Sequence, residues 1–265
     1  MTIELAPEEF AGVLPLYHAT DLRFPLISAV LERRQRGQVF GGQRSALVVN
    51  NFGFMFYAGE TNEEFDTSLR ELFETASGIK PSYLLWYSPP ARWQQYLSER
   101  GARLRERVRF EFGADQLSES VVCPAEFEMR RLDAELIPKT KKFGLDIDSR
   151  FWSSAKDFET NGLGCCILKD DEVVSVCYAA AISEQLAEVD VVTDEAYRGH
   201  GLASIVSRQF IRECLAREIT PTWDCFAYNT GSLRLAEKLG FAEVRRYPFY
   251  SFNVPLPPRG TNDGL

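Results

Sequence analysis

The sequence has no excess of basic residues and only two histidines. Its 30 lysines and arginines are outnumbered by 38 aspartates and glutamates, which gives a net charge of −8. Binding to nucleic-acid phosphates depends on clustered positive charge, so we expect no nucleic-acid partner. The six cysteines contain no Cys-x-x-Cys pair and no metal-type spacing. We therefore expect no metal site, and free thiols in a reducing compartment.

The sequence also lacks a hydrophobic run long enough to cross a bilayer. The most apolar stretch, residues 46–58, is interrupted by Asn50 and Asn51, whereas a membrane-spanning helix needs about 20 apolar residues. The first residues, Met1-Thr2-Ile3-Glu4, have neither the basic start nor the apolar centre of a secretory signal. We therefore expect no membrane partner and a cytoplasmic location.

The segment from Ala187 to Ala203, AEVDVVTDEAYRGHGLA, has the pattern of a strand, a polar turn and a helix. Polar and apolar side chains alternate as far as Val192, which is typical of a strand. The first amides of the following helix have no internal partner, and the helix dipole adds partial positive charge there. Gly199 and Gly201 carry no side chain that would keep an anion away. The segment therefore predicts a phosphate or pyrophosphate site.

The loop by itself does not identify the phosphate ligand. It does not end in the Gly-Lys-Ser/Thr of a nucleoside-triphosphate loop. It is one residue away from a dinucleotide pattern, since Ser204 stands where a third Gly or Ala belongs, but a polar hinge separates it from the strand. The loop alone is also compatible with an ordinary turn capped by glycines.

Two motifs in order resemble the GNAT acetyltransferase superfamily. Arg198-x-x-Gly201-x-Ala203 after a Val-Thr strand end resembles its acetyl-CoA pyrophosphate loop. Downstream, a strand runs into Asn229-Thr230-Gly231-Ser232 and then Leu235-Ala236-Glu237-Lys238-Leu239-Gly240-Phe241, which resembles its second signature. The likeness covers roughly residues 150–252, and it is greatest to a bacterial branch with Pro-x-Trp-Asp before the asparagine.

The resemblance implies that acetyl-CoA is the co-substrate. It places the pyrophosphate at Arg198, Gly199, His200, Gly201, Leu202 and Ala203. It places the pantetheine arm along the backbone of Val191, Val192 and Thr193. Asn229 and Ser232 are further expected cofactor contacts, and Asn229 is equally suited to cap a helix.

Glu188 and Asp190 stand two residues apart and so share one face of the predicted strand. The resemblance implies catalytic roles for both, because an acid at this place in the superfamily accepts the proton of the amine. A purely solvent-facing position is the alternative. Many relatives protonate the leaving sulfur with a tyrosine whose place is taken here by Ala236. The donors left open are Tyr228, which is the catalytic candidate, Cys225, Tyr250 and water.

The sequence predicts an α/β (α+β) protein of two lobes. Residues 121–254 are expected to form the acetyltransferase domain, a mixed, twisted sheet with flanking helices, and residues 255–265 a flexible tail. Residues 1–120 are expected to form an N-terminal α/β lobe in which 38–50 and 52–58 are single strands. The order strand, helix, glycine, strand occurs in both halves. The first lobe is therefore either a degenerate copy of the same fold without the phosphate loop, or an unrelated α/β lobe.

These expectations give one principal hypothesis and one alternative. The principal hypothesis is an N-acetyltransferase that moves an acetyl group from acetyl-CoA to a primary amine of a small molecule by direct attack in a ternary complex, as a monomer or homodimer. The alternative is a regulatory or interaction module that binds acetyl-CoA without turnover, which the missing tyrosine and the large first lobe favour. The two acids on the strand favour the enzyme.

Overall fold

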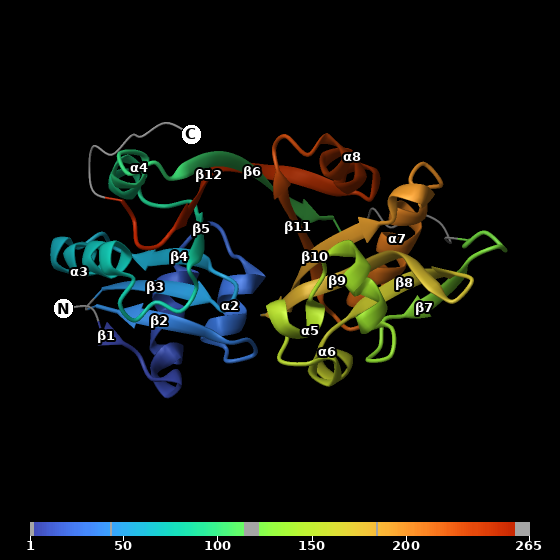
Figure 1. Cartoon of the computed structure of the whole chain (residues 1–265), viewed down its shortest axis with the longest axis horizontal. Coiled ribbons are helices and arrows are strands. Elements are labelled where there is room, and N and C mark those ends of the chain that lie inside the picture. The colour runs from blue at the N-terminus through green and yellow to red at the C-terminus, as the bar shows by residue number, and fades with distance from the viewer. Residues whose placement is uncertain (1–2, 43, 114–121, 184, 258–265) are drawn as a thin grey trace. The chain divides into compact units, whose positions relative to one another are not determined.

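The chain folds into two compact units, each a mixed sheet flanked by helices, as predicted for the fold class (Figure 1). The computed structural model describes residues 3–42, 44–113, 122–183 and 185–257. Unit 1 comprises residues 1–107 and 247–265, and unit 2 comprises residues 108–246. The predicted lobe boundary, between residues 120 and 121, lies outside the described residues.

The two halves of the sequence run through the same order of elements, apart from the additional 3₁₀ helix η4 of the second half. The first half contains β1 (Ile3–Glu4), η1 (Pro7–Val13), α1 (Leu14–His18), α2 (Pro25–Leu31), β2 (Gly37–Gly41), β3 (Ser45–Asn50), β4 (Phe54–Gly59), α3 (Glu63–Thr75), β5 (Tyr83–Tyr87), α4 (Ala91–Ser98) and β6 (Arg103–Phe112). The second half contains β7 (Glu128–Arg131), η3 (Ile137–Phe143), α5 (Ile147–Arg150), α6 (Ala155–Asn161), β8 (Gly164–Lys169), β9 (Glu172–Ser183), β10 (Leu186–Thr193), η4 (Glu195–Tyr197), α7 (Leu202–Leu215), β11 (Thr220–Phe226), α8 (Thr230–Lys238) and β12 (Phe241–Asn253).

The two units also share the order and the relative directions of their first five strands. In unit 1 the strands follow the order β1-β2-β3-β4-β5-β12, and in unit 2 the order β7-β8-β9-β10-β11-β6. The first three steps are antiparallel in both units, and the fourth, β4 to β5 or β10 to β11, is parallel. Two unrelated lobes would not be expected to share both features, so the topology favours the degenerate-copy interpretation of the first lobe.

The last strand of each half completes the sheet of the other half. In unit 1, Phe249 to Asn253 of β12 pair antiparallel with Tyr87 to Tyr83 of β5. In unit 2, Val108 and Phe110 of β6 are buried in the core. The Leu256 side chain is also buried in unit 1, and its amide donates to the Phe73 carbonyl oxygen at 2.8 Å. Of the residues that we expected to form a flexible tail, Leu256 is therefore held in unit 1, Pro255 and Pro257 are exposed, and residues 258–265 lie outside the described part of the chain.

Residues 38–50 form a hairpin and not the single strand that their apolar run predicts. Strands β2 and β3 pair from Gly37↔Asn50 to Gly41↔Ala46. The prediction was wrong because Gly41 and Gly42, which mark the turn, sit inside an otherwise continuous strand-like pattern.

Helix α7 covers one face of the sheet in unit 2 and so fixes where its N-terminus lies. It packs across β8, β9, β10 and β11 (Figure 1). Its buried side chains Leu202, Val206, Phe210, Ile211 and Cys214 meet inward-facing residues of the sheet such as Cys177, Ala187 and Val189. Full burial of a large apolar side chain contributes about 1.5–3 kcal/mol, so this face holds the loop before α7 at the end of β10.

Candidate functional site

Strands β10 and β11 part after a short parallel ladder. Their register covers only Leu186↔Thr220, Ala187↔Pro221 and Glu188↔Thr222. Beyond Glu188, β10 continues to Thr193 paired with β9 alone, and a bulge in β9 occurs at the same place, between the Glu188 and Val189 pairs. The backbone of Val191, Val192 and Thr193 on the β11 side is therefore outside that ladder, and these residues are half-buried. This is the geometry needed for the predicted pantetheine contacts.

The glycine loop presents backbone and open space to an incoming anion. Gly199 has a φ of 84° and Gly201, the N-cap of α7, a φ of 77°. A Cβ atom built at either glycine would meet nothing within 4 Å. No side chain caps the helix, so the amides of its first turn, beginning with Leu202 and Ala203, have no partner of that kind. The loop therefore has backbone donors and open space for the predicted pyrophosphate, whose binding here stays a prediction.

The side chains around the loop contribute less than its backbone. Arg198 is exposed and pairs with Glu195 at 3.0 Å. The Nδ1 atom of His200 lies 3.2 Å from the carbonyl oxygens of Tyr197 and Arg198. The Leu202 side chain is buried in the core, and Ala203 is half-buried. Of this set, only Arg198 offers a full positive charge near the loop.

Asn229 and Ser232 have structural partners in unit 2. The Asn229 Oδ1 atom accepts a hydrogen bond from the Ser232 amide at 3.1 Å and so caps α8. The Ser232 Oγ atom accepts one from the Trp223 indole at 3.0 Å. Helix capping by Asn229 is therefore present, and cofactor contacts by these two residues remain predictions.

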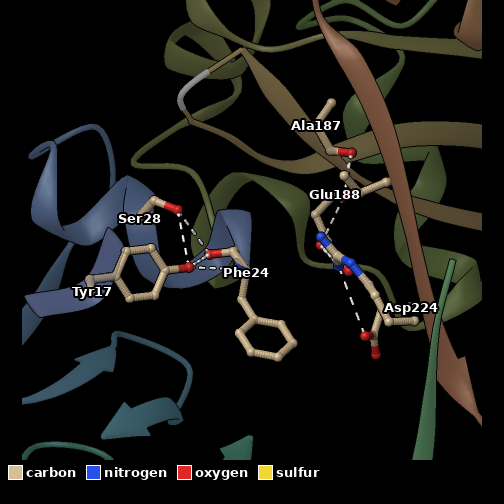
Figure 2. A network of polar contacts seen from close by, with 8 residues as sticks. Tyr17, Phe24, Ser28, Ala187, Glu188 and Asp224 are labelled. Atoms are coloured by element: carbon tan, nitrogen blue, oxygen red, sulfur yellow. Dashed lines mark hydrogen bonds and ion pairs between the residues drawn. The ribbon is translucent and has the colours of Figure 1, made fainter. Parts of the chain in front are cut away.

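Glu188 is buried in a polar network on the sheet face opposite α7. Its Oε2 atom lies 3.1 Å from Arg109 Nη1 and 3.2 Å from Thr222 Oγ1 (Figure 2). Thr222 Oγ1 also donates to the Ala187 carbonyl oxygen at 3.0 Å. The Asp224 carboxylate joins the network, with its Oδ2 atom 3.9 Å from the same Arg109 nitrogen and its side chain fully buried. The network lies where β10 and β11 part.

Asp190 points to the same face as Glu188 but has a different partner. The Tyr178 hydroxyl donates to Asp190 Oδ2 at 2.7 Å. Burial, reinforced by the Asp190 carboxylate, raises the pKa of Tyr178 well above its usual value. The phenol therefore stays protonated at neutral pH and keeps its role as donor to Asp190.

The candidates for the general acid lie in different surroundings. Tyr228 is 67% exposed and stacks on Phe226, with ring centroids 5.1 Å apart. Cys225 is buried in the core of unit 2. Tyr250 belongs to unit 1, where its hydroxyl lies 3.2 Å from Ser98 Oγ. Ala236, where the resemblance implies the place of a tyrosine in many relatives, is completely buried in the apolar core of unit 2.

The helix of unit 1 that corresponds to α7 has an N-terminus poorly suited to binding an anion. Helix α3 occupies the equivalent place in the element order, but the Asn62 side chain caps it by accepting from the Phe65 amide at 3.1 Å. Glu63, Glu64 and Asp66 stand in its first turn. These carboxylates already complement the helix dipole and repel a phosphate. We therefore expect no CoA site at α3.

Two classes of site have no support in the part of the chain that the structure describes. In those residues no group of three or more His, Cys, Asp or Glu side chains is placed to hold a metal ion. Likewise, no described helix has both the length and the apolar character of a membrane span.

Sequence reasoning missed three members of the buried face. Arg109 lies in the strand that the first half contributes, 79 residues away from Glu188 in sequence. Asp224 lies in the Trp-Asp motif that carries the resemblance, and Tyr178 in the strand next to Asp190. A signal for Arg109 exists in the alternating arginines 103, 105, 107 and 109 of β6, which share one face of the strand.

Comparisons with known proteins agree with the motifs. A sequence model of the GNAT acetyltransferase family matches residues 20–250. The chain is 27% identical over 232 residues to the "Uncharacterized N-acetyltransferase YdfB" of Bacillus subtilis, covering 84% of this chain and 88% of that one. A GCN5-related N-acetyltransferase-like protein from Streptococcus suis is similar in structure, with a TM-score of 0.72 and 27% identity, covering 92% of this chain and 98% of that one. A tandem GNAT protein from the clavulanic acid biosynthesis pathway has the same fold, with a TM-score of 0.67 at 15% identity, covering 97% and 99% of the two chains.

Proposed function

Because the chain belongs to the GNAT acetyltransferase family and is an acetyltransferase enzyme, we propose that it transfers the acetyl group of acetyl-CoA to a primary amine of a small molecule. The proposed reaction is direct attack in a ternary complex of enzyme, acetyl-CoA and amine. One observation carries the proposal: an uncapped helix with two glycines of positive φ follows a strand that parts from its neighbour.

The residues of unit 2 fit the proposed co-substrate. The amides from Gly199 to Ala203 would hold the pyrophosphate, with Arg198 and His200 at its edge. The backbone of Val191, Val192 and Thr193 would hold the pantetheine arm, and Asn229 and Ser232 would lie beside it. Acetyl-CoA supplies an acyl group activated as a thioester, and the remaining chemistry is positioning and proton transfer.

The two acids of β10 have separate proposed roles. The amine nitrogen forms a bond to the acyl carbon, the carbon–sulfur bond breaks, and one proton leaves the nitrogen. Glu188 is the proposed acceptor of that proton, directly or through a water. Asp190, which is less buried than Glu188, is proposed to attract the cationic amine to the site, with Tyr178 fixing its carboxylate.

The leaving thiolate takes up one proton as the thiol forms. Tyr228 is the proposed donor, because it is an exposed tyrosine just beyond the end of β11. The step needs little assistance, since a thiol has a pKa only slightly above neutral.

The cysteines support a cytoplasmic location for this reaction. All six are free thiols, and all except Cys123 are buried. Burial raises the pKa of Cys165 and of Cys214 above the usual thiol value. Such thiols are poor nucleophiles and suit a structural role in a reducing compartment.

The function is tested by thiol release from acetyl-CoA with a panel of primary amines, each compared with its alcohol and tertiary-amine analogues. We expect release that depends on a primary amine, with mass spectrometry detecting one acetylated amine for each thiol. Equal release with the analogues, or acetylation of none of the primary amines across a chemically broad panel, would contradict the proposed acceptor class.

A further inference from the structure

Arg109 is a buried arginine that the first half of the sequence supplies to the sheet of unit 2. Its neighbours on β6, Val108 and Phe110, point into the core beneath α7. Because side chains alternate along a strand, Arg109 points to the opposite face. There its Nη1 atom lies 3.1 Å from Glu188 Oε2 of β10 and 3.9 Å from Asp224 Oδ2 of β11.

We propose that Arg109 is a positioning residue for acetyl transfer, which holds the Glu188 carboxylate where β10 and β11 part. Strand β6, the last strand of the first half, then contributes a positioning residue to the catalytic unit in addition to completing its sheet. The inference rests on the proposed role of Glu188 as proton acceptor.

The chemistry of the guanidinium suits this role. Its planar fork of donors is charged at all relevant pH values and gives a carboxylate a fixed direction, which an ammonium on a flexible stem does not. All three side chains are at least nine-tenths buried, with exposed fractions of 4% for Arg109, 8% for Glu188 and 0% for Asp224. Little water screens the contacts there, so the position of the cation strongly affects both carboxylates.

Arg109 differs from Arg107 of the same strand in the residues that it contacts. Arg107, two residues earlier, stacks over the Phe249 ring of unit 1 at 5.1 Å from the centroid. It is therefore a matched control: the same residue type, on the same strand and the same face, with different partners.

The test compares Arg109→Met, Arg109→Lys and Arg107→Met by steady-state kinetics against pH, using an amine that supports turnover. We expect Arg109→Met to lower kcat roughly tenfold or more and to move its acidic limb to higher pH, because a carboxylate that loses a neighbouring cation gives up its proton only at higher pH. Arg109 of β6 and Thr222 of β11 lie against the Glu188 carboxylate, and Asp224 of β11 shares the Arg109 nitrogen with it. Arg109→Lys should restore part of kcat, and the affinity for CoA should not change.

A double variant keeps the test decisive if Arg109→Met alone fails to fold. Arg109→Met combined with Glu188→Gln removes both charges of the pair, and its kcat should be no lower than that of Glu188→Gln alone if Arg109 acts through Glu188. Two results would overturn the role of Arg109 but leave the role of Glu188 standing. One is losses of kcat that add up in the double variant. The other is a wild-type pH profile in Arg109→Met while Glu188→Gln is slow. Unchanged turnover in Glu188→Gln would instead remove the proposed base. A shifted acidic limb in Arg107→Met would show that the effect is not specific to position 109.

Discussion

Gly201→Val is expected to remove CoA binding while the protein stays folded. The glycine is the N-cap of α7 with a φ of 77° and open space where a Cβ would lie. A valine there would occupy the space proposed for the pyrophosphate. Two charge-assisted hydrogen bonds lost at about 1.5–3 kcal/mol each correspond to a Kd raised roughly 10²–10⁴-fold. Titration calorimetry with CoA measures the effect.

The control for this variant is Gly144→Val. Gly144 follows η3 in the same unit, has a φ of 71°, and likewise has nothing within 4 Å of a built Cβ. Both variants force valine into the left-handed region, a strain of about 1–3 kcal/mol, so both should lower Tm by similar amounts. Only Gly201→Val should lose CoA. Wild-type affinity in Gly201→Val, or equal losses in the two variants, would remove the loop from the account.

Glu188→Gln is expected to lower kcat roughly a hundredfold or more, because the amide cannot accept the proton of the amine. Glutamine has nearly the same shape and keeps an oxygen that can accept from Thr222. Asp224 remains 3.9 Å from the Arg109 guanidinium, so the buried cation keeps a carboxylate beside it and the fold should survive. Steady-state kinetics against pH should show a loss that shrinks at high pH, where the amine is already neutral.

Asp190→Asn is the matched comparison for Glu188→Gln. It changes a carboxylate to an amide on the same strand face, two residues away, and we expect it to raise the apparent KM of the amine more than it lowers kcat. If Glu188→Gln turned over like the wild type, the proton acceptor would have to be another group. If both variants lowered kcat equally without affecting KM, the separate roles of the two acids would be wrong.

Local pattern was sufficient to predict much of the fold. Alternation located β10 and helical spacing located α7, because each is a continuous segment whose buried face recurs at a fixed period. The strand and helix on either side of Asn229 were expected from the second motif. The hairpin within residues 38–50 was missed because both strands are largely buried and the glycines at their turn do not interrupt the strand-like pattern. The placement of β6 in unit 2 and of the end of β12 in unit 1 could not be read from the sequence, since nothing local to a strand states which sheet it completes.

The same distinction between local and long-range features applies to the candidate site. The glycine loop was predictable because its geometry depends on consecutive residues, with Gly199 and Gly201 at positive φ as an anion loop requires. The Asp190–Tyr178 and Glu188–Arg109 contacts join residues of different strands. A sequence shows that such residues exist, but their partners are set by sheet order and register.

The central claim is that acetyl-CoA binds at the N-terminus of α7 and along the end of β10. It is tested most directly by a crystal structure of the full chain with CoA. The account predicts one CoA per chain, its pyrophosphate on the amides from Gly199 to Ala203 and its pantetheine arm beside Val191, Val192 and Thr193. A CoA molecule at the N-terminus of α3, or one whose pyrophosphate lies away from Gly201, would contradict it.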